Sequence, residues 1–336
     1  MMRAMRAESF VGYGGLKLVE VPRPRRTDGR VLVRITAAGV TPLDHTILSG
    51  GYSRATAPLI LGNEGAGVVE DPGDSVFSEG ARVMFTGPYG VAEDGTYSEW
   101  ISVRHEDLCI IPDTIDDATA GGMPVAYLTA QIALTQARFE PGKIVLAPAI
   151  GGAVGNAVTQ LARAQGAAKT ISTTTNPAKA EQARALGFDN VIDLSAESLT
   201  EGVARLTGGR GVDVVVDSVG GALTGHALAT LAPGGVLTSL GYSAGRQTTI
   251  DVTDLIWRRA TMSGFSLFAQ SHAIKAAAWA AILPLLTSKR VKPLVERAYN
   301  LDEAAEALRH LIEDRPFGRV VLAEGVNGAS REKRNA

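Results

Sequence analysis

The segment from residue 143 to 155 has the pattern of a nucleotide-binding turn. An apolar stretch leads into small residues and then into helical spacing, in the order Lys-Ile-Val-Leu-Ala-Pro-Ala-Ile-Gly-Gly-Ala-Val-Gly. A strict G-x-G-x-x-G motif fails because Ile150 stands at its first position, whereas A-x-x-G-x-x-G is satisfied. A plain strand–turn–helix connection is the alternative, but the strand before the turn and the helix after it favour a dinucleotide pyrophosphate site. Its predicted residues are Ala149, Gly152, Ala153, Val154 and Gly155.

The end of the next expected strand indicates which dinucleotide fits. An acidic residue about 20 positions beyond the glycines would bind the ribose hydroxyls of NAD, but the segment from residue 172 to 179 has no acid before Glu181. Hydroxyl groups and one cation suit the 2′-phosphate of NADPH, although Lys179 could also be a solvated helix residue. The sequence therefore favours NADPH over NADH. The predicted contacts are Ser172, Thr173, Thr174 and Lys179.

Two kinds of structure are expected to position these residues. Short strands separated by turn residues in the first hundred positions suggest a partly open β-barrel. These strands are expected at Val31–Ala37, Gly67–Glu70, Arg82–Thr86 and Tyr97–Val103. From residue 124 onward, strands alternate with helices, which predicts an α/β, doubly wound, mostly parallel sheet. Its strands are expected at 143–147, 170–173, 191–193, 212–217, 235–240 and 261–267.

The last part of the chain is too small for a third domain. Helices are expected at 273–288 and 302–313, with strands at 291–295 and 318–322. We expect these elements to fold back onto the N-terminal domain. The predicted domains are therefore 1–123 together with 269–336, and 124–268, with a loose polar tail at 325–336.

Composition limits the function classes. Cys109 is the only cysteine, so an intrachain disulfide and a multi-cysteine metal site are excluded. The formal net charge of -2 gives no electrostatic footprint for nucleic acid or an anionic membrane. Residues 1–8 are polar and do not resemble a signal peptide, and no apolar run is long enough to span a bilayer. These features predict a cytoplasmic protein whose partners are small molecules.

Several motifs carry a resemblance that covers nearly the whole chain. They are Gly-Asn-Glu-Gly-Ala-Gly-Val-Val at 62–69, Gly-Thr-Tyr-Ser-Glu at 95–99, Pro-Val-Ala-Tyr-Leu-Thr-Ala at 124–130, the segment 211–221, and Phe-Gly-Arg-Val-Val-Leu at 317–322. In this order and spacing they resemble the zinc-independent quinone oxidoreductases (zeta-crystallin-like) of the medium-chain dehydrogenase/reductase superfamily. The resemblance implies a GroES-like catalytic domain built from both chain ends, an inserted Rossmann-like domain that binds NADPH, and a homodimer or homotetramer.

Metal binding is not expected. Zinc-containing relatives place a cysteine where this chain has Thr41 and a histidine where it has Asn63, and neither replacement is a good zinc ligand. The five histidines show no ligand spacing, and His45 is better explained by a surface or packing role.

The resemblance also implies the chemistry and further site residues. Hydride would pass from NADPH to a quinone or to the β-carbon of an α,β-unsaturated carbonyl. Tyr52 matches a tyrosine that faces the active site in some relatives, where it would be either a proton donor or a pocket wall. Thr41 and Thr129 could orient nicotinamide or substrate, and Arg319 could reach a cofactor phosphate or lie in solvent. The residues expected beside the nicotinamide half are Ser218, Gly241, Tyr242, Phe265 and Leu267.

Other functions stay open. Thr41 stands where quinone reductases usually have an asparagine, so the substrate pocket could differ from theirs. The first alternative is a reductase of enones, enoyl thioesters or haloacrylates. The second is a non-catalytic NADPH-binding or RNA-binding protein, which the lack of a basic stripe disfavours.

Overall fold

The computed structural model describes residues 1–323, so the predicted tail at 325–336 lies outside the described residues. The chain divides into two compact units. The first contains Met1–Val125 and the residues from Pro293 onward, and the second contains Ala126–Lys292. In the described part of the chain, no helix is both long and apolar enough to cross a membrane.

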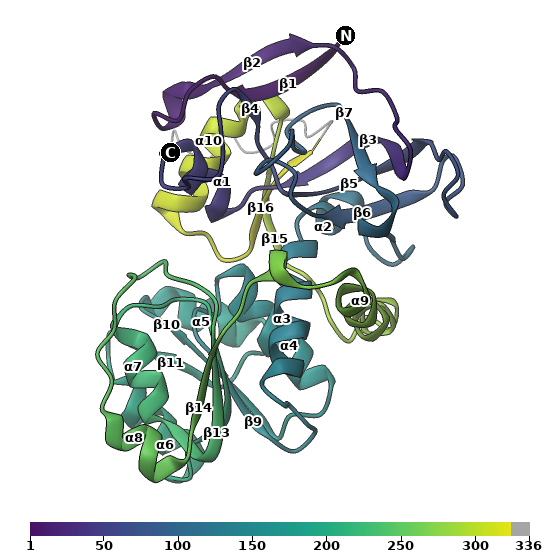
Figure 1. Ribbon diagram of the computed structural model, residues 1–336. Coiled ribbons are helices and arrows are strands. Elements are labelled where there is room, and N and C mark those ends of the chain that lie inside the picture. Colours follow the sequence, from purple (N-terminus) through teal and green to yellow (C-terminus); the bar gives the residue numbers. More distant parts are fainter. Residues whose placement is uncertain (324–336) are drawn as a thin grey trace. The chain divides into compact units, whose positions relative to one another are not determined.

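The second unit is built on a six-stranded parallel sheet with the order β11-β10-β9-β12-β13-β14 (Figure 1). Its strands are β9 (Ile144–Ala147), β10 (Lys169–Thr174), β11 (Val191–Asp193), β12 (Val212–Asp217), β13 (Leu231–Ser239) and β14 (Thr261–Gly264). Its helices are α3 (Pro124–Gln136), α4 (Ala153–Ala164), α5 (Pro177–Ala185), α6 (Leu199–Thr207), α7 (Ala222–Ala229), α8 (Val252–Arg258) and α9 (His272–Thr287). Strand order reverses between β9 and β12, which is the switch point where such sheets bind ligands. The predicted doubly wound α/β sheet is confirmed.

The core of this sheet explains why its strands could be predicted from the sequence. Each of five neighbouring strands contributes a fully buried residue to one apolar cluster. These residues are Leu146, Ile171, Ile192, Val215 and Leu237. Parallel strands covered on both faces need continuous apolar runs, and that is the pattern seen in the sequence.

The first unit is made of antiparallel sheets with one parallel pair, β15 and β16. A three-stranded sheet contains β1 (Met2–Ala7), β2 (Leu16–Val21) and β4 (Leu59–Ile60). A seven-stranded sheet contains β3 (Arg30–Gly39), β5 (Glu64–Asp71), β6 (Arg82–Thr86), β7 (Trp100–Arg104), β8 (Leu108–Ile110), β15 (Val295–Tyr299) and β16 (Arg319–Ala323). Strand β3 pairs with β16, β5 and β7, so the sheet curls into the predicted partly open barrel. The helices are α1 (Pro42–Leu48), α2 (Asp117–Gly121) and α10 (Ala304–Arg309). Short helical turns lie at Tyr13–Gly15, His105–Asp107, Leu267–Ala269, Leu301–Glu303 and His310–Asp314.

The second domain boundary differs from the predicted one. The sequence placed it at 268/269, whereas the contacts place it at 292/293, so helix α9 groups with the parallel sheet. Hydrogen bonds fix this: the Arg290 guanidinium donates to the carbonyl of Ala164, and the Gln160 amide bonds the backbone of Lys292. The predicted strand at 291–295 is also shifted, since β15 covers 295–299.

Candidate cofactor and substrate site

The turn between β9 and α4 is unusually tight. Ala149 adopts a left-handed conformation with φ 65°, which a residue with a Cβ rarely takes. A Cβ on Gly155 would lie 2.2 Å from the carbonyl oxygen of Pro148, so only glycine fits there. The turn is tied to β10, because the backbone N–H of Ile150 donates to the carbonyl of Thr173 at 2.9 Å. This geometry brings the predicted positions 149, 152 and 155 together.

The start of α4 is free to bind an anion. Gly152 is its N-cap and supplies no side-chain hydrogen bond, whereas Asn176 caps α5 and Ser198 caps α6. The first N–H groups of a helix have no partner within the helix. At the start of α4 these groups belong to Ala153 and Val154, and they carry the positive end of the helix dipole. A pyrophosphate fits this uncapped start.

The hydroxyls at the end of β10 are buried and hydrogen-bonded to the neighbouring backbone. Ser172 and Thr173 are 1% and 2% exposed. The Ser172 hydroxyl donates to the carbonyl of Ala147, and the Thr173 hydroxyl accepts from the N–H of Ala149 at 3.1 Å. These hydrogen bonds tie the end of β10 to the end of β9 and to the turn that follows it. Thr174 is also buried, and its hydroxyl accepts from the N–H of Asn176 at 3.2 Å.

Beyond Thr174 the chain becomes accessible. Thr175 and Asn176 are exposed, and Lys179 lies half-buried on the first turn of α5. Sequence reasoning did not select Thr175 or Asn176 as site residues. The Asn-Pro pair at 176–177 was a readable signal, because asparagine before a proline at the first helical position is a typical helix start.

The late strands end beside one another, as predicted. Ser218 follows β12 and Gly241 follows β13 closely, and a Cβ on Gly241 would lie 2.0 Å from the carbonyl oxygen of Ser218. Tyr242 is 51% exposed, Phe265 is half-buried, and Leu267 is buried in a short helical turn. All five residues lie at or beyond the carboxyl ends of β12, β13 and β14, where parallel sheets bind ligands.

Asp217 was not predicted, although it organises this edge. It is fully buried at the last position of β12. One carboxylate oxygen accepts from the N–H groups of Val219 and Gly220 at 2.9 and 3.0 Å, and the other accepts from the Thr224 hydroxyl. An acid that ends a buried apolar strand was the signal in the sequence, because such a residue needs local donors.

A polar cluster in the first unit surrounds Thr41. Thr41 is the N-cap of α1 and forms a capping box with Asp44. The Thr41 hydroxyl donates to the Asp44 carboxylate at 2.7 Å, and Asp44 also accepts from the N–H of Gly62 at 3.1 Å and the hydroxyl of Tyr97 at 3.2 Å. Burial raises the pKa of the Asp44 carboxyl, while these hydrogen bonds act in the opposite direction. Thr41 thus caps the start of α1, and its hydroxyl proton is engaged in the hydrogen bond to the Asp44 carboxylate.

The positions that correspond to zinc ligands lie side by side. The Thr41 hydroxyl oxygen is 3.4 Å from the Asn63 side-chain oxygen, and both residues are 3% exposed. A threonine hydroxyl and a carboxamide are not the thiolate, imidazole or carboxylate donors that zinc sites use. Among residues 1–323, no group of three or more His, Cys, Asp or Glu side chains is arranged to hold a metal ion.

Tyr52 and Thr129 lie in different units. Tyr52 follows α1 in the loop before β4 and is half-buried against an apolar cluster that includes Leu48 and Leu59. One side of its ring therefore packs on the core of the first unit. Thr129 is 5% exposed on α3, the first helix of the second unit.

Arg319, for which the sequence left a cofactor phosphate or solvent open, is buried and paired with a carboxylate of the same unit. It is 7% exposed and forms an ion pair with Glu64, which is fully buried. The second carboxylate oxygen of Glu64 accepts from the N–H of Val125 at 2.7 Å. Burial raises the pKa of Glu64, and the Arg319 guanidinium opposes that shift. Gly39 makes room for the pair, since a Cβ there would lie 2.3 Å from a Glu64 oxygen.

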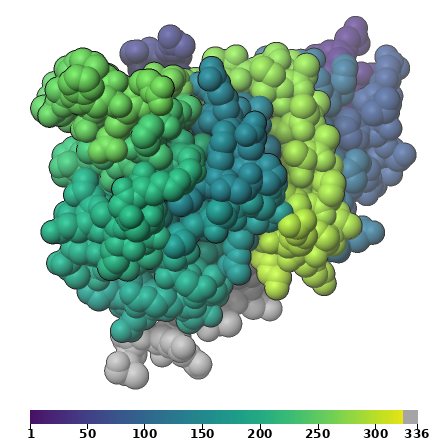
Figure 2. All heavy atoms as spheres, turned by 90° about the horizontal axis from the view of Figure 1, so that it is seen from below, coloured from purple at the N-terminus to yellow at the C-terminus, as the bar shows by residue number. Residues whose placement is uncertain are grey.

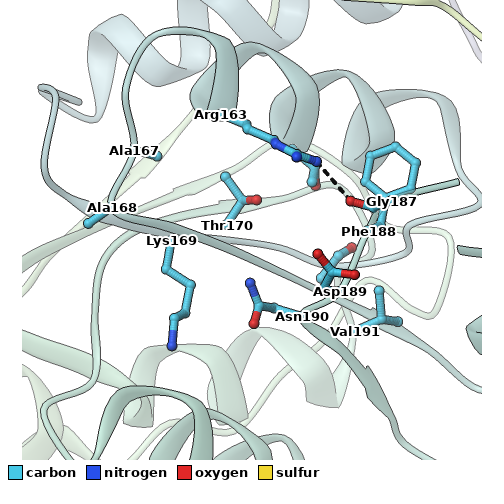
Figure 3. Close-up of a pocket in the computed structure, with 12 residues that line it drawn as sticks. Arg163, Ala167, Ala168, Lys169, Thr170, Gly187, Phe188, Asp189, Asn190 and Val191 are labelled. Carbon is cyan, nitrogen blue, oxygen red and sulfur yellow. Dashed lines mark hydrogen bonds between the residues drawn. The ribbon is translucent and has the colours of Figure 1, made fainter. Parts of the chain in front are cut away.

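A separate cavity lies near the start of β10. It has a volume of about 220 Å³, and its polar side chains include Arg163, Lys169 and Asn190 (Figure 3). The Arg163 guanidinium donates to the carbonyl of Gly187 at 2.8 Å, as the dashed line in Figure 3 marks. Because Lys169 opens β10, this cavity is reached from the amino end of the strand, away from the turn that fits a pyrophosphate.

Known proteins match both units of the chain. Residues 27–113 match the family described as alcohol dehydrogenase GroES-like domain, and residues 153–285 match the family described as zinc-binding dehydrogenase. A quinone oxidoreductase of Pseudomonas aeruginosa is 33% identical over 93% of this chain and 98% of its own length. A 2-haloacrylate reductase of a Burkholderia species is 34% identical over 67% of this chain and 69% of its own length.

A solved structure extends the likeness to three dimensions. It is a mycobacterial protein in complex with NADPH, and it is 28% identical with a TM-score of 0.85, covering 96% of this chain and 100% of that one. The GroES-like domain with an inserted Rossmann-like sheet, expected from the motifs, agrees with these matches. The chain belongs to the quinone oxidoreductase family of the medium-chain dehydrogenase/reductase superfamily, whose members are nicotinamide-dependent oxidoreductases.

Proposed function

We propose that the protein is a zinc-independent, NADPH-dependent reductase that transfers hydride to a quinone. The observation that carries this proposal is the uncapped start of α4 beside a strand end that has no acid. The cofactor supplies the hydride, and the protein binds and orients the reactants and excludes water. The setting we propose is the cytoplasm, with neither nucleic acid nor a membrane as partner.

The end of β10 supports NADPH over NADH. Thr174 stands at its last position, and Thr175, Asn176 and Lys179 follow without a carboxylate among them. A carboxylate there would bind ribose hydroxyls and repel a 2′-phosphate. The cation of Lys179 and the exposed hydroxyl of Thr175 suit the phosphate. The NADPH bound to the mycobacterial relative is consistent with this choice.

The donor set in the first unit supports a conjugated acceptor. Thr41 and Asn63 do not fit zinc, so oxidation of an alcohol would lack the Lewis acid that lowers the pKa of its hydroxyl. A quinone or enone needs only hydride and a proton. Tyr52 is the proposed proton donor to the acceptor oxygen, and Thr129 and Thr41 are proposed to shape the nicotinamide and substrate surfaces.

A reductase of α,β-unsaturated carbonyls is the second candidate. The 34% identity to a 2-haloacrylate reductase favours it, because haloacrylates are conjugated acids reduced at carbon. A non-catalytic NADPH-binding or RNA-binding role is a weaker candidate, since the formal net charge is -2.

The substrate range tests the proposal directly. The purified protein, without added metal, is expected to oxidise NADPH in the presence of simple quinones. NADH should be at least about tenfold less effective, the factor that one charge-assisted hydrogen bond supplies.

Two variants test the proposed residues. Lys179→Ala should remove most of the preference for NADPH over NADH. Tyr52→Phe should slow turnover by roughly 10²–10⁴, because it removes the proposed proton donor. Preference for enones would select the second candidate, and equal use of NADH would contradict the assignment of the β10 end.

A homodimer is proposed at the open edge of the parallel sheet, with a homotetramer as the larger alternative. Helix α8 exposes Val252, Ile256 and Trp257 by 59%, 57% and 78%, and the edge strand β14 exposes Met262 by 39%. Figure 2 shows light-green residues of this part of the sequence at the outer surface of the second unit. An apolar strip beside an unpaired edge strand is a typical protein interface.

The molar mass of the protein in solution tests whether this surface forms the dimer interface. Trp257→Glu is expected to raise the dimer dissociation constant at least about thirtyfold, because a buried interface tryptophan contributes roughly 2 kcal/mol or more. Val76→Glu is the matched control, since Val76 is 96% exposed on the first unit. Light scattering should show a monomer for Trp257→Glu and a dimer for Val76→Glu. A dimer that survives Trp257→Glu would place the interface elsewhere.

A further inference from the structure

A chain of amide hydrogen bonds leads from the proposed pyrophosphate turn to the last residue of the second unit. The Asn156 side-chain nitrogen donates to the carbonyl of Ile150 at 3.2 Å, and its side-chain oxygen accepts from the Gln160 side chain at 2.7 Å. Gln160 in turn bonds the backbone of Lys292 twice. Asn156 and Gln160 are one helical turn apart on α4, so a single helix face carries the whole chain.

The two amides have their orientations fixed by backbone groups. The Gln160 side-chain nitrogen donates to the Lys292 carbonyl at 2.9 Å, and its oxygen accepts from the Lys292 N–H at 2.8 Å. Gln160 must therefore present an N–H to Asn156, which leaves the nitrogen of Asn156 for Ile150. Each group has a matched partner, and no rotation of either amide keeps all four bonds.

The two ends of this series of hydrogen bonds lie in the proposed pyrophosphate turn and at the point where the polypeptide leaves the second unit. Ile150 is fully buried within the turn that follows the left-handed Ala149. Lys292 is the residue after which the polypeptide leaves the second unit, since the first unit resumes at Pro293. Lys292 itself is exposed, and both its carbonyl and its N–H bond the amide of Gln160. The turn is therefore connected to the crossover between the units by way of two side chains, those of Asn156 and Gln160.

We infer that Gln160 is a positioning residue that couples occupancy of the phosphate turn to the backbone of the crossover segment. The inference rests on the proposed function, because it takes NADPH as the occupant of the turn. When the cofactor holds the turn, Ile150 fixes Asn156, Asn156 fixes Gln160, and the crossover residue Lys292 loses freedom. Gln160 is not a catalytic residue, and its task is to transmit the state of the turn.

Hydrogen exchange measures the coupling without any assay of turnover. In the wild-type protein, saturating NADPH should slow exchange of the Lys292 N–H by about fivefold, the factor that one hydrogen bond of ordinary strength supplies. In Gln160→Leu, exchange at Lys292 should be roughly fivefold faster without cofactor, and NADPH should no longer slow it. Cofactor-dependent protection that persists in this variant would overturn the inference.

A second variant distinguishes the Ile150 end of this series of hydrogen bonds from the Lys292 end. Asn156→Asp keeps the oxygen that accepts from Gln160 but removes the donor to Ile150. It should leave Lys292 protected without cofactor and abolish the further protection by NADPH. Full cofactor-dependent protection in Asn156→Asp would show that the signal bypasses this residue, which would also overturn the inference.

Gln165→Leu is the matched control. Gln165 is the C-cap of α4, and its side-chain nitrogen donates to the side-chain oxygen of Gln131 at 2.7 Å. Its removal should leave both exchange effects as in the wild type. The cofactor-free measurements also separate two failures. If NADPH does not bind at all, the proposed function fails, whereas unchanged Lys292 exchange in cofactor-free Gln160→Leu overturns the link itself.

Discussion

Gly155→Ala is expected to lower the affinity for NADPH by roughly 10–100-fold, the equivalent of about 1–3 kcal/mol of overpacking. The new Cβ would lie 2.2 Å from the carbonyl oxygen of Pro148 and 2.5 Å from that of Ala149. Both obstacles are backbone atoms, so the turn itself must move. Isothermal titration with NADPH would measure the loss, and the free energy of unfolding should fall by a similar amount without cofactor.

Two glycines serve as controls for this variant. A Cβ on Gly152 would lie 3.2 Å from the carbonyl oxygen of Ala149, so the cofactor-free protein should tolerate Gly152→Ala with less than about 1 kcal/mol of destabilisation. Gly14 has open space around its Cβ position, and Gly14→Ala should change neither quantity. If Gly155→Ala bound NADPH as tightly as Gly14→Ala, the pyrophosphate would not depend on this turn.

Glu64→Gln is expected to destabilise the first unit by about 3–5 kcal/mol, because it leaves the charge of Arg319 buried without a partner. Glu64 is fully buried and Arg319 is 7% exposed, so water can replace little of the lost interaction. Glutamine keeps the volume and still offers an oxygen to the N–H of Val125. Urea unfolding followed by circular dichroism would measure the change.

An exposed pair and a double variant test the reasoning. The Arg205 and Glu197 side chains pair with 56% and 26% exposure, so Glu197→Gln should cost no more than about 1 kcal/mol. Replacing both Glu64 and Arg319 with leucine and methionine should recover much of the stability, because no unpaired charge then remains. A loss below about 1 kcal/mol for Glu64→Gln would mean that solvent reaches Arg319.

The parallel sheet was predictable because its strands have a clear sequence pattern. Each is a short apolar run between glycine-rich turns, and the helices between them have clear starts and stops. Strands β1 and β2 and helices α1 and α8 were not predicted. In β1, buried Met2, Ala4 and Ala7 alternate imperfectly with Arg3 and Arg6, and these two arginines made the stretch look merely polar. Helix α1 has seven residues, too few to show a helical period, although its capping box was visible.

The site was predictable at the level of segments and less so at the level of side chains. The turn at 149–155 lies where the motif placed it, but Ser172 and Thr173 point into the fold and hold that turn. Residue type alone does not say on which face of a strand a hydroxyl lies. Arg319 had no visible partner because Glu64 is 255 positions away in the sequence. Pairs of this separation follow from topology, which local patterns do not contain.

The wide separation of Glu64 and Arg319 sets an order for biosynthesis. Residues 126–292 form a complete unit, so this part can fold on the ribosome as soon as it has left the exit tunnel. The first unit must wait for β16, the last described strand, although its own residues are the first to be made. Until then the buried carboxyl of Glu64 has no counter-ion and β3 lacks one of its neighbours. The oldest part of the nascent chain is thus the last to become native.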